Sequence, residues 1–401
     1  MSCEEYHAMW LCCVVTDNDI KRRMLSAFGT PGAIYEAPGE ELQSKANLDE
    51  TLVKRLVSTR TAEYCDRLLQ RIERDAITFL WHEDEGFPKR LKEIRDAPLG
   101  LFAQGRLPWK NGAGGVPASR SELAVAIVGT RQSSPYGNFV ARQFGQGFAD
   151  AGIPVVSGLA MGIDAASHQG CLAGDGFPVA VLGSGIGAAY PRNNTLLFRN
   201  VIDRGCVISE YGPGVPALAH HFPHRNRLIA GLADGVVVVE AQAKSGTLIT
   251  VDRALEQGKS VYVVPGRVTD KNSIGCNQLI REGAQLVTDP GEVMADLAAQ
   301  SGVPIFTRNE DGCLRFLTID GETEPFRDTH NKKEKKPLAS NEKIVYAFLR
   351  LSPKHFDQLI WESGLTPSEL TNALYSLERE GLVERISPGC FSVRDTGLYD
   401  R

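Results

Sequence analysis

The central part of the chain alternates short apolar runs with longer segments whose apolar residues recur at helical spacing. The apolar runs lie at 124–128, 153–156, 179–182, 206–208, 236–239, 261–264 and 286–287. The intervening amphipathic segments lie at 139–151, 165–173, 194–203, 226–233, 248–257 and 277–282. Strands that are apolar throughout and alternate with helices are typical of a parallel sheet covered on both faces. The pattern therefore predicts one doubly wound α/β domain over residues 120–300.

The regions before this domain have a different pattern. Residues 1–75 carry short apolar groups at helical spacing, separated by turns such as Thr30-Pro31-Gly32, which predicts a small helical domain. Residues 76–119 hold two short apolar runs and a Gly-rich stretch, so we expect a bridging segment there.

The regions after the domain predict a linker and a second small domain. Residues 301–338 lose the periodicity and end in a run rich in lysine, which predicts a linker. Residues 339–401 combine three amphipathic helices with two short strands around Pro388-Gly389, the pattern of a winged helix.

Composition and charge narrow the class of protein. The chain has 401 residues, enough for two to three domains, and a formal net charge of −5. A uniformly basic nucleic-acid protein is excluded, whereas a local basic site is not. From residue 341 to 401 there are seven Lys and Arg against nine Asp and Glu. We therefore expect the winged helix to be a protein-contact module or a weak accessory rather than the main reader of DNA.

Cysteine usage and the first residues predict a cytoplasmic protein. The nine cysteines are scattered and no two have Cys-x-x-Cys spacing, which disfavours zinc ribbons and suits a reducing compartment. The apolar run from Ala8 to Val15 is too short to span a membrane and follows two acidic residues, Glu4 and Glu5. We expect a buried first helix and no membrane partner.

Basic and glycine-rich loops follow most of the predicted strands. In an open parallel sheet, ligands bind at the carboxyl ends of the strands, and Gly-rich loops at helix N-termini present backbone N–H groups to phosphates. Five basic side chains are expected on this rim: Arg131, Arg225, Arg227, Lys244 and Arg267. One or two of them are expected to pair instead with a nearby carboxylate, from Asp164, Glu210 or Glu240. Phe222 and Tyr190 either stack a base there or plug the loop core.

Motifs for catalysis, metal binding or cofactor binding are weak. Gly258-Lys259-Ser260 is not a phosphate-binding loop, because Arg253 stands where its first glycine is needed. His220, His221 and His224 are close in sequence, but Pro223 is expected to interrupt any helix between them, so we expect no metal site. We expect no cofactor and no catalytic residue.

Five motifs in the α/β region together resemble the DNA-processing protein A (DprA/Smf) family. They are Val128–Arg131, Ser157–Asp164, Phe222–Ala230, Ser245–Thr250 and Val264–Gly266, in the family's order. The resemblance implies an extended Rossmann-like domain, with a helical (SAM-like or helix-hairpin-helix-like) domain before it and a winged helix after it.

The same resemblance implies a function and a set of site residues. Members of the family bind single-stranded DNA in a basic groove, form homodimers, and load the RecA recombinase during natural transformation; they are not enzymes. Arg131 is then the leading DNA-binding residue. The DNA-binding residues expected are Arg131, Lys244, Arg225, Asn226, Arg227, Ser157, Gly158, Gly183, Ser245, Gly246, Phe222 and Arg267.

Two other functions stay open on the sequence. The rim could hold a nucleotide, as in Rossmann enzymes that cleave nucleoside monophosphates, with Glu240 or Asp164 as the carboxylate. The winged helix could instead belong to a nucleotide-sensing transcription regulator. Its third helix, residues 366–380, has one Arg and three Glu, which argues against that second function.

Overall fold

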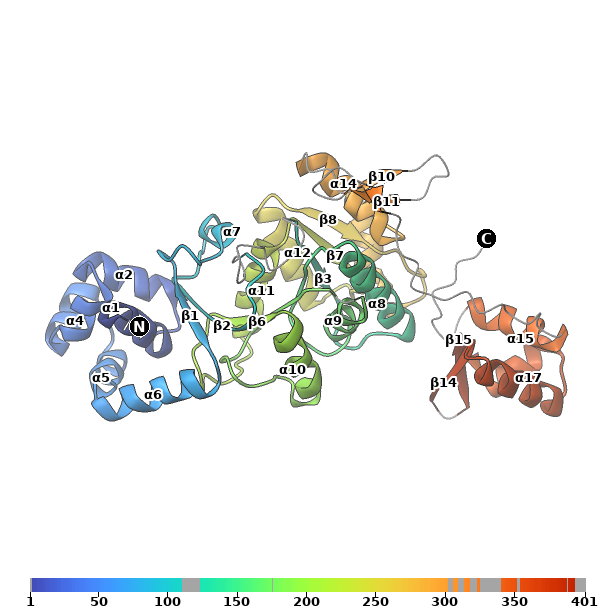
Figure 1. Ribbon diagram of the computed structural model, residues 1–401, viewed down its shortest axis with the longest axis horizontal. Helices are drawn as coiled ribbons and strands as arrows, with labels where there is room; N and C mark the ends of the chain where they lie inside the picture. The colour runs from blue at the N-terminus through green and yellow to red at the C-terminus, as the bar shows by residue number, and fades with distance from the viewer. Residues whose placement is uncertain are drawn as a thin grey trace. The chain divides into compact units, whose positions relative to one another are not determined.

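The computed structural model describes residues 2–109, 123–174, 176–301, 306–308, 314–317, 323–324, 340–351, 354–387 and 389–393. The chain divides into two compact units, Met1–Glu324 and Pro325–Arg401 (Figure 1). The first unit holds the predicted α/β domain together with the N-terminal helices, and the second holds the winged helix.

The α/β domain is built on a nine-stranded sheet with the order β1-β2-β6-β5-β4-β3-β7-β8-β9. The strands from β6 to β9 along this order are parallel. The parallel strands are β3 (Val125–Val128), β4 (Val155–Ser157), β5 (Pro178–Leu182), β6 (Cys206–Ser209), β7 (Gly235–Val238), β8 (Ser260–Val263) and β9 (Gln285–Leu286). Each of the seven coincides with an apolar run of the sequence, which confirms the predicted doubly wound class.

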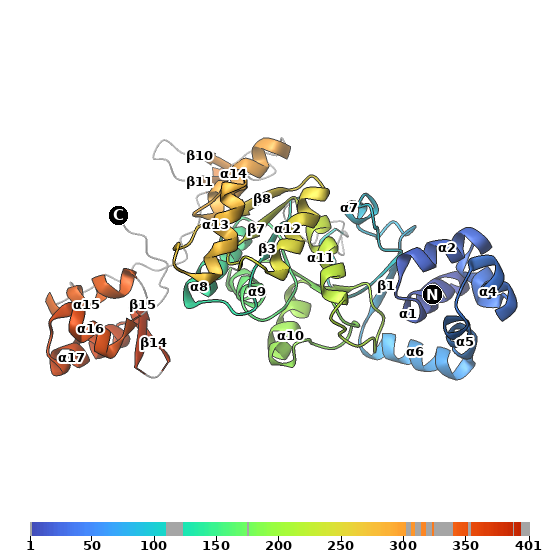
Figure 2. The ribbon, with the colours of Figure 1, turned by 180° about the vertical axis from the view of Figure 1, so that it is seen from behind.

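Helices cover both faces of this sheet (Figures 1 and 2). One face packs against α11 (His221–Leu232), α12 (Gly246–Glu256) and α13 (Ile274–Arg281). The other packs against α8 (Pro135–Asp150), α9 (Ile163–Ala173), α10 (Thr195–Arg204) and α14 (Pro290–Ser301). Alternate residues of a strand enter opposite cores: Val125 and Ile127 face α8, whereas Ala126 and Val128 face α11.

The strand order reverses between β3 and β7. From β3 the chain steps outward through β4, β5 and β6, and then returns to place β7 on the other side of β3. The loops after β3 and β7 therefore leave the sheet in opposite directions and open a crevice at its carboxyl edge.

The segment expected to bridge two domains adds two strands to the same sheet. β1 (Thr78–Trp81) pairs with β2 (Gly100–Gly105), which pairs antiparallel with β6, and α7 (Lys89–Lys92) lies between them in sequence. The register joins Phe102 to Ser209, more than a hundred residues later in the chain. Local pattern carries no information on such a pairing.

The N-terminal helices form their own core. They are α1 (Cys3–Val14), α2 (Asn18–Phe28), α3 (Pro31–Glu36), α4 (Gly39–Ala46), α5 (Glu50–Ser58) and α6 (Ala62–Arg74). Trp10, Met24, Ile34, Leu42 and Leu56 are fully buried in this core. The predicted buried first helix is confirmed: α1 packs between this core and the sheet. Among the described residues, no helix is long and apolar enough to cross a bilayer.

The second unit is a winged helix. It contains α15 (Ser340–Leu351), α16 (Phe356–Ser363), α17 (Pro367–Arg379) and a sheet of β13 (Lys354–His355), β15 (Cys390–Val393) and β14 (Val383–Ser387), in that order. Thr366 and Glu369 cap α17 reciprocally in a capping box. The expected linker, 301–338, falls mostly outside the described residues. Its described part includes β10 (Phe306–Arg308), β11 (Leu314–Leu317) and β12 (Thr323–Glu324), which pair antiparallel.

Candidate nucleic-acid interface

A pocket of about 670 Å³ opens at the crevice between β3 and β7. Its walls come from the loop after β3, from the first turns of α11 and from the segment that connects β7 to α12. Seven of the twelve predicted site residues line it: Arg131, Phe222, Arg225, Asn226, Lys244, Ser245 and Gly246. Two more, Gly158 and Gly183, line an adjoining recess of about 70 Å³ that shares Arg131 and Phe222 with the pocket.

Arg131 and Lys244 supply the exposed positive charge of the pocket. Arg131 follows β3 and Lys244 follows β7, and both are exposed to solvent. Within the described part of the chain, no carboxylate lies within ion-pair distance of either cation. Both charges are therefore available to an anionic ligand.

Two aromatic rings lie beside this charge. The ring of Phe222 is 5.5 Å from that of Tyr190, centroid to centroid, and the Arg131 guanidinium lies over Phe222 at 4.8 Å. Gly183 makes this arrangement possible, because a Cβ there would lie 2.8 Å from Cδ1 of Phe222. A cation beside two neighbouring rings suits a ligand with a phosphate and a base.

Arg225 is part of the pocket floor rather than a mobile cation. It is 3% exposed, and its guanidinium Nη1 donates to the carbonyl oxygens of Gly158, at 2.8 Å, and of Val181. Burial lowers the pKa of Arg225 to about 10, with Asp164 opposing that shift. A Cβ on Gly158 would lie 2.4 Å from Nη1, so this glycine is required for the buried guanidinium to fit. Arg225 thus ties α11 to the ends of β4 and β5.

The N-terminus of α12 completes the wall opposite β3. The Ser245 hydroxyl caps this helix by accepting from the Thr247 amide at 3.2 Å, and Gly246 is open to solvent, with no atom within 4 Å of a Cβ placed there. The dipole of this helix N-terminus adds to the positive potential of Lys244. Asn226 is half-buried, and its side-chain oxygen accepts from Arg225 Nε at 3.1 Å.

Three predicted site residues lie outside both cavities. Arg227 is buried and its Nη2 donates to both carboxylate oxygens of Glu210, at 2.8 and 2.7 Å, so it is one of the arginines expected to pair with a carboxylate. Ser157 is fully buried, and its hydroxyl donates to the Ile127 carbonyl at 2.6 Å. Arg267 is exposed after β8 but lines neither cavity. Arg227 and Ser157 are thus buried and line neither cavity, and their expected role as DNA contacts stays a prediction.

The expectation that Pro223 interrupts a helix is wrong. α11 begins at His221, and Pro223 fits its first turn because the missing N–H would have no partner there. His221 stacks on Tyr211 with 4.0 Å between ring centroids, and His224 faces Glu210. Among the described residues no group of three or more metal-ligating side chains converges.

The two carboxylates considered for catalysis have different positions. Glu240 does not line the pocket; its oxygens accept from the amide of Ser134, at 2.9 Å, and from that residue's hydroxyl. Asp164 does line the pocket and is buried. Burial raises the pKa of Asp164, while Arg225 and Arg131 oppose the shift.

Several pocket residues were not singled out from the sequence. They are polar side chains in or just after the same loops: Thr130, Gln132, Gln242, Thr247 and Thr250. The sequence did hold a cue to them, since each lies within about six residues of Arg131 or Lys244. Polar neutral residues are common in loops, however, and nothing local marks which of them point inward.

Each of the two compact units contains a match to a known protein family. The family described as DNA recombination-mediator protein A matches residues 78–298, and the family described as DprA winged helix domain matches residues 330–389. The protein Smf of Synechocystis is 31% identical over 350 residues, which cover 84% of this chain and 85% of that protein. The DNA processing protein DprA of Streptococcus pneumoniae is 43% identical over 213 residues, which cover 53% of this chain and 72% of that protein. The X-ray structure of DprA from Streptococcus pneumoniae matches with a TM-score of 0.61 and 32% identity, covering 74% of this chain and 99% of that one.

Proposed function

Because the chain belongs to the DNA recombination-mediator protein A (DprA/Smf) family, we propose that it binds single-stranded DNA in the pocket between β3 and β7 and passes it to the RecA recombinase. The carrying observation is the combination in that pocket of two exposed cations, Arg131 and Lys244, with the ring pair of Phe222 and Tyr190. The cations suit the phosphates of a strand, and the rings suit unstacked bases.

The chemistry of the pocket favours a single strand over a duplex. Bases that are free to stack on Phe222 and Tyr190 exist only where a strand is unpaired. We expect binding to tolerate any sequence, because stacking on a ring and contact with a phosphate do not distinguish one base from another. The protein then acts on DNA in the cytoplasm as a binding and transfer factor, without catalysis and without a cofactor.

A titration series tests this proposal. Fluorescent single-stranded and duplex oligonucleotides of equal length are titrated at several salt concentrations. We expect tighter binding of the single strand and a slope of about −0.7 in log K against log salt for each phosphate neutralised. Equal affinity for the duplex, or a slope near zero, contradicts the proposal.

Transfer to RecA requires its own assay. A single-strand-binding protein that coats a DNA strand prevents RecA from assembling on it. We therefore expect the chain to restore RecA filament formation on such a coated strand. The Arg131→Ala chain serves as the control, because it lacks one of the two pocket cations. RecA assembly at the same rate with and without the wild-type chain contradicts the transfer step.

We further propose that the chain forms a homodimer through the β9 edge of the sheet. Exposed apolar side chains lie on β9 and on the helix that precedes it: Leu286 of β9 and Ile274 of α13. An edge strand flanked by apolar side chains is suited to pairing with a second copy. Light scattering tests this: Leu286→Lys should give a monomer, whereas Leu196→Lys, at an exposed leucine of α10, should not. A monomeric wild-type chain contradicts the homodimer.

A nucleotide-cleaving activity is the second candidate, favoured by one observation. Asp164 is a buried carboxylate that lines the pocket beside Arg131. Incubation with nucleoside monophosphates, followed by chromatography for free base, tests it. Release of base by the wild-type chain that is lost in Asp164→Asn would establish the activity; no release would leave binding as the function of the pocket.

A further inference from the structure

Helix α11 carries two sets of side chains with different surroundings. Phe222, Arg225 and Asn226 line the pocket, whereas His224 and Arg227 turn to the other side of the helix. Because both sets lie within two turns of one helix, a displacement on one side moves the other. The contacts of Arg227 therefore help to hold the helix that carries the pocket residues.

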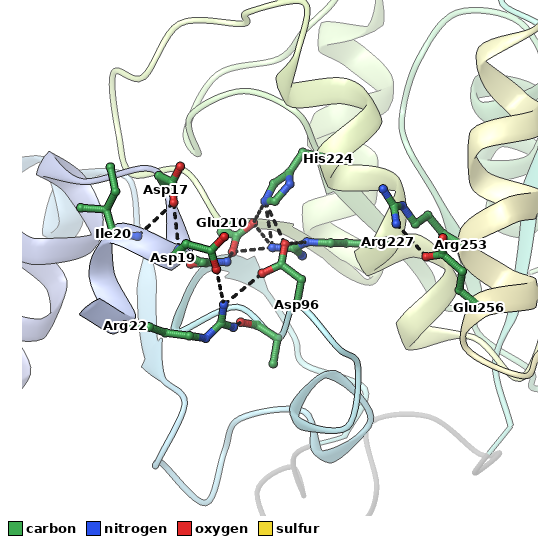
Figure 3. A network of polar contacts seen from close by, with 12 residues as sticks. Asp17, Asp19, Ile20, Arg22, Asp96, Glu210, His224, Arg227, Arg253 and Glu256 are labelled. Atoms are coloured by element: carbon green, nitrogen blue, oxygen red, sulfur yellow. Dashed lines mark hydrogen bonds and ion pairs between the residues drawn. The ribbon is translucent and has the colours of Figure 1, made fainter. Parts of the chain in front are cut away.

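Arg227 is held by two carboxylates from different segments (Figure 3). Its Nη2 donates to Glu210, which follows β6, and its Nε donates to Asp96 at 3.1 Å. His224 lies beside both, with Nε2 at 3.5 Å from Glu210 Oε2 and 3.8 Å from Asp96 Oδ2. Glu210 is 1% exposed, so its negative charge is separated from water.

The N-terminal helical domain completes the surroundings of Glu210. Asn18, in the first turn of α2, donates from Nδ2 to Glu210 Oε1 at 2.6 Å. Lys21, one turn later, is fully buried, and its Nζ has no hydrogen-bond partner within the described residues. Arg22 donates to Asp96 at 3.2 Å and to the Ala97 carbonyl.

The buried charge of Glu210 depends on all the partners that surround it. Burial alone would raise the pKa of Glu210, but Arg227, His224 and Lys21 together hold it well below its ordinary value. A buried carboxylate that loses one of its partners is costly, because the rest of its charge stays uncompensated. Removal of α2 would take away the amide of Asn18 and the ammonium of Lys21 at once.

We propose that Glu210 is a positioning residue for the DNA-binding pocket, and that the N-terminal helical domain holds the pocket in its binding geometry through Asn18 and Lys21. This rests on the proposed function of the pocket. α2 lines neither cavity, so its effect on DNA passes through Glu210, Arg227 and α11. Coupling is reciprocal: DNA in the pocket stabilises the contact of α2 with Glu210.

Hydrogen exchange on the wild-type chain tests the coupling without any substitution. Amide exchange is followed with and without a saturating oligothymidine. We expect slower exchange in the pocket segments and also in α2, residues 18–28. Slower exchange in the pocket with unchanged exchange in α2 overturns this inference alone. Failure of the wild-type chain to bind the oligothymidine contradicts the proposed function instead.

An exchange of amide and carboxylate tests the residues. In the full chain, Asn18→Asp sets a second carboxylate against Glu210, and we expect about tenfold weaker binding of oligothymidine, within the usual range for coupled sites. The double variant Asn18→Asp/Glu210→Gln restores an amide–carboxylate pair with the roles reversed. It also leaves Arg227 with a single amide oxygen in place of a carboxylate, so it should recover part of the loss. A loss caused by any other contact of Asn18 would not be recovered in this way.

Arg23 provides the matched control. It lies on α2 but is exposed, so Arg23→Ala should bind as the wild type does. An Asn18→Asp chain that melts and binds as the wild type does overturns the inference, and so does a loss that the double variant leaves unchanged. If Asn18→Asp does not fold, the hydrogen-exchange measurement on the wild-type chain decides.

Discussion

The guanidinium of Arg131 lies over the ring of Phe222, 4.8 Å from its centroid. The contact joins the loop after β3 to the first turn of α11, the two walls of the proposed DNA-binding pocket. A ring face attracts the cation without neutralising it, so Arg131 is oriented but keeps its charge for a phosphate. The pair therefore predicts separate effects for loss of the charge and loss of the ring.

Loss of the charge should weaken DNA binding without unfolding the chain. Arg131→Ala and Lys244→Ala should each bind single-stranded DNA about tenfold more weakly, and each should reduce the salt slope by about 0.7. Exposed cations contribute little to folding, under ~1 kcal/mol, so the melting temperature should stay near that of the wild type. Arg142→Ala is the control, since Arg142 is exposed on α8 and contacts Gln169 outside the pocket. An Arg131→Ala chain that unfolds, or binds normally, contradicts the assignment.

Loss of the ring should weaken binding only where bases are present. Phe222→Leu should lower the affinity for an oligothymidine by about 1–3 kcal/mol, the usual contribution of stacking a base. An abasic strand of the same length has phosphates but no bases, so its affinity should change little. The measurement is the affinity of the wild-type chain and of the Phe222→Leu chain for each of the two strands. An equal loss for the two strands would mean that Phe222 acts only by placing Arg131.

Arg225 should behave as a structural residue although it belongs to the same motif as the predicted DNA contacts. Arg225→Ala leaves the carbonyls of Gly158 and Val181 without their buried donor, which should lower the free energy of unfolding by about 3 kcal/mol. Gly158→Ala should also destabilise, because the new Cβ would displace the guanidinium. Urea unfolding of the two variants beside Gly246→Ala, at an open position, checks both effects. Wild-type stability of Arg225→Ala would contradict this role.

His168 should make the stability of the chain depend on pH. Burial first, and Arg225 second, lower its pKa from 6.5 to about 3. Between these values the unfolded chain binds a proton that the folded chain does not. The free energy of unfolding should therefore fall as the pH decreases from 6.5 toward 3, by about 1.4 kcal/mol for each pH unit.

Urea unfolding at about pH 6.5 and pH 5 measures this slope. His168→Asn should lose one proton's share of it, about 2 kcal/mol over that interval. Gln169→Asn, at the exposed neighbour of His168 on α9, removes no titratable group and should keep the wild-type slope. An identical slope in the His168→Asn and wild-type chains would show that the imidazole titrates freely.

The winged helix should contribute little to single-strand binding. Two of its cations already have partners: Lys354 pairs with Glu362 at 2.5 Å, and Arg385 lies 3.9 Å from Glu378. It also forms a compact unit separate from the one that holds the pocket. Deletion of residues 339–401 should therefore change the affinity for single-stranded DNA less than tenfold. A larger loss in a chain with an unchanged circular dichroism spectrum of the α/β domain would place part of the site in the winged helix.

The local pattern of apolar residues was sufficient to find the strands of the sheet. A parallel strand inside the sheet is buried on both faces and is therefore largely apolar, and β3, β4, β5, β6, β7 and β8 were found on that ground. The edge strand β9 is exposed at both residues and only overlaps the last, two-residue apolar run. The positions of Arg131 and Lys244 followed as well, because a residue just after a parallel strand has to leave at the carboxyl edge. The capping box of α17 is another local feature, decided by Thr366 and Glu369.

Tertiary structure decided which of several equal candidates reach the ligand. Arg131, Arg225 and Arg227 were equal candidates on the same rim of the sheet, yet only Arg131 is exposed. Arg225 and Arg227 lie in α11, where Arg225 donates to buried carbonyls and Arg227 pairs with Glu210. The Glu210 contact with Asn18 spans 192 positions of sequence. Burial and ion pairing depend on which distant segments the fold brings together, so the division of these arginines into ligand contacts and structural anchors is a property of the packed chain.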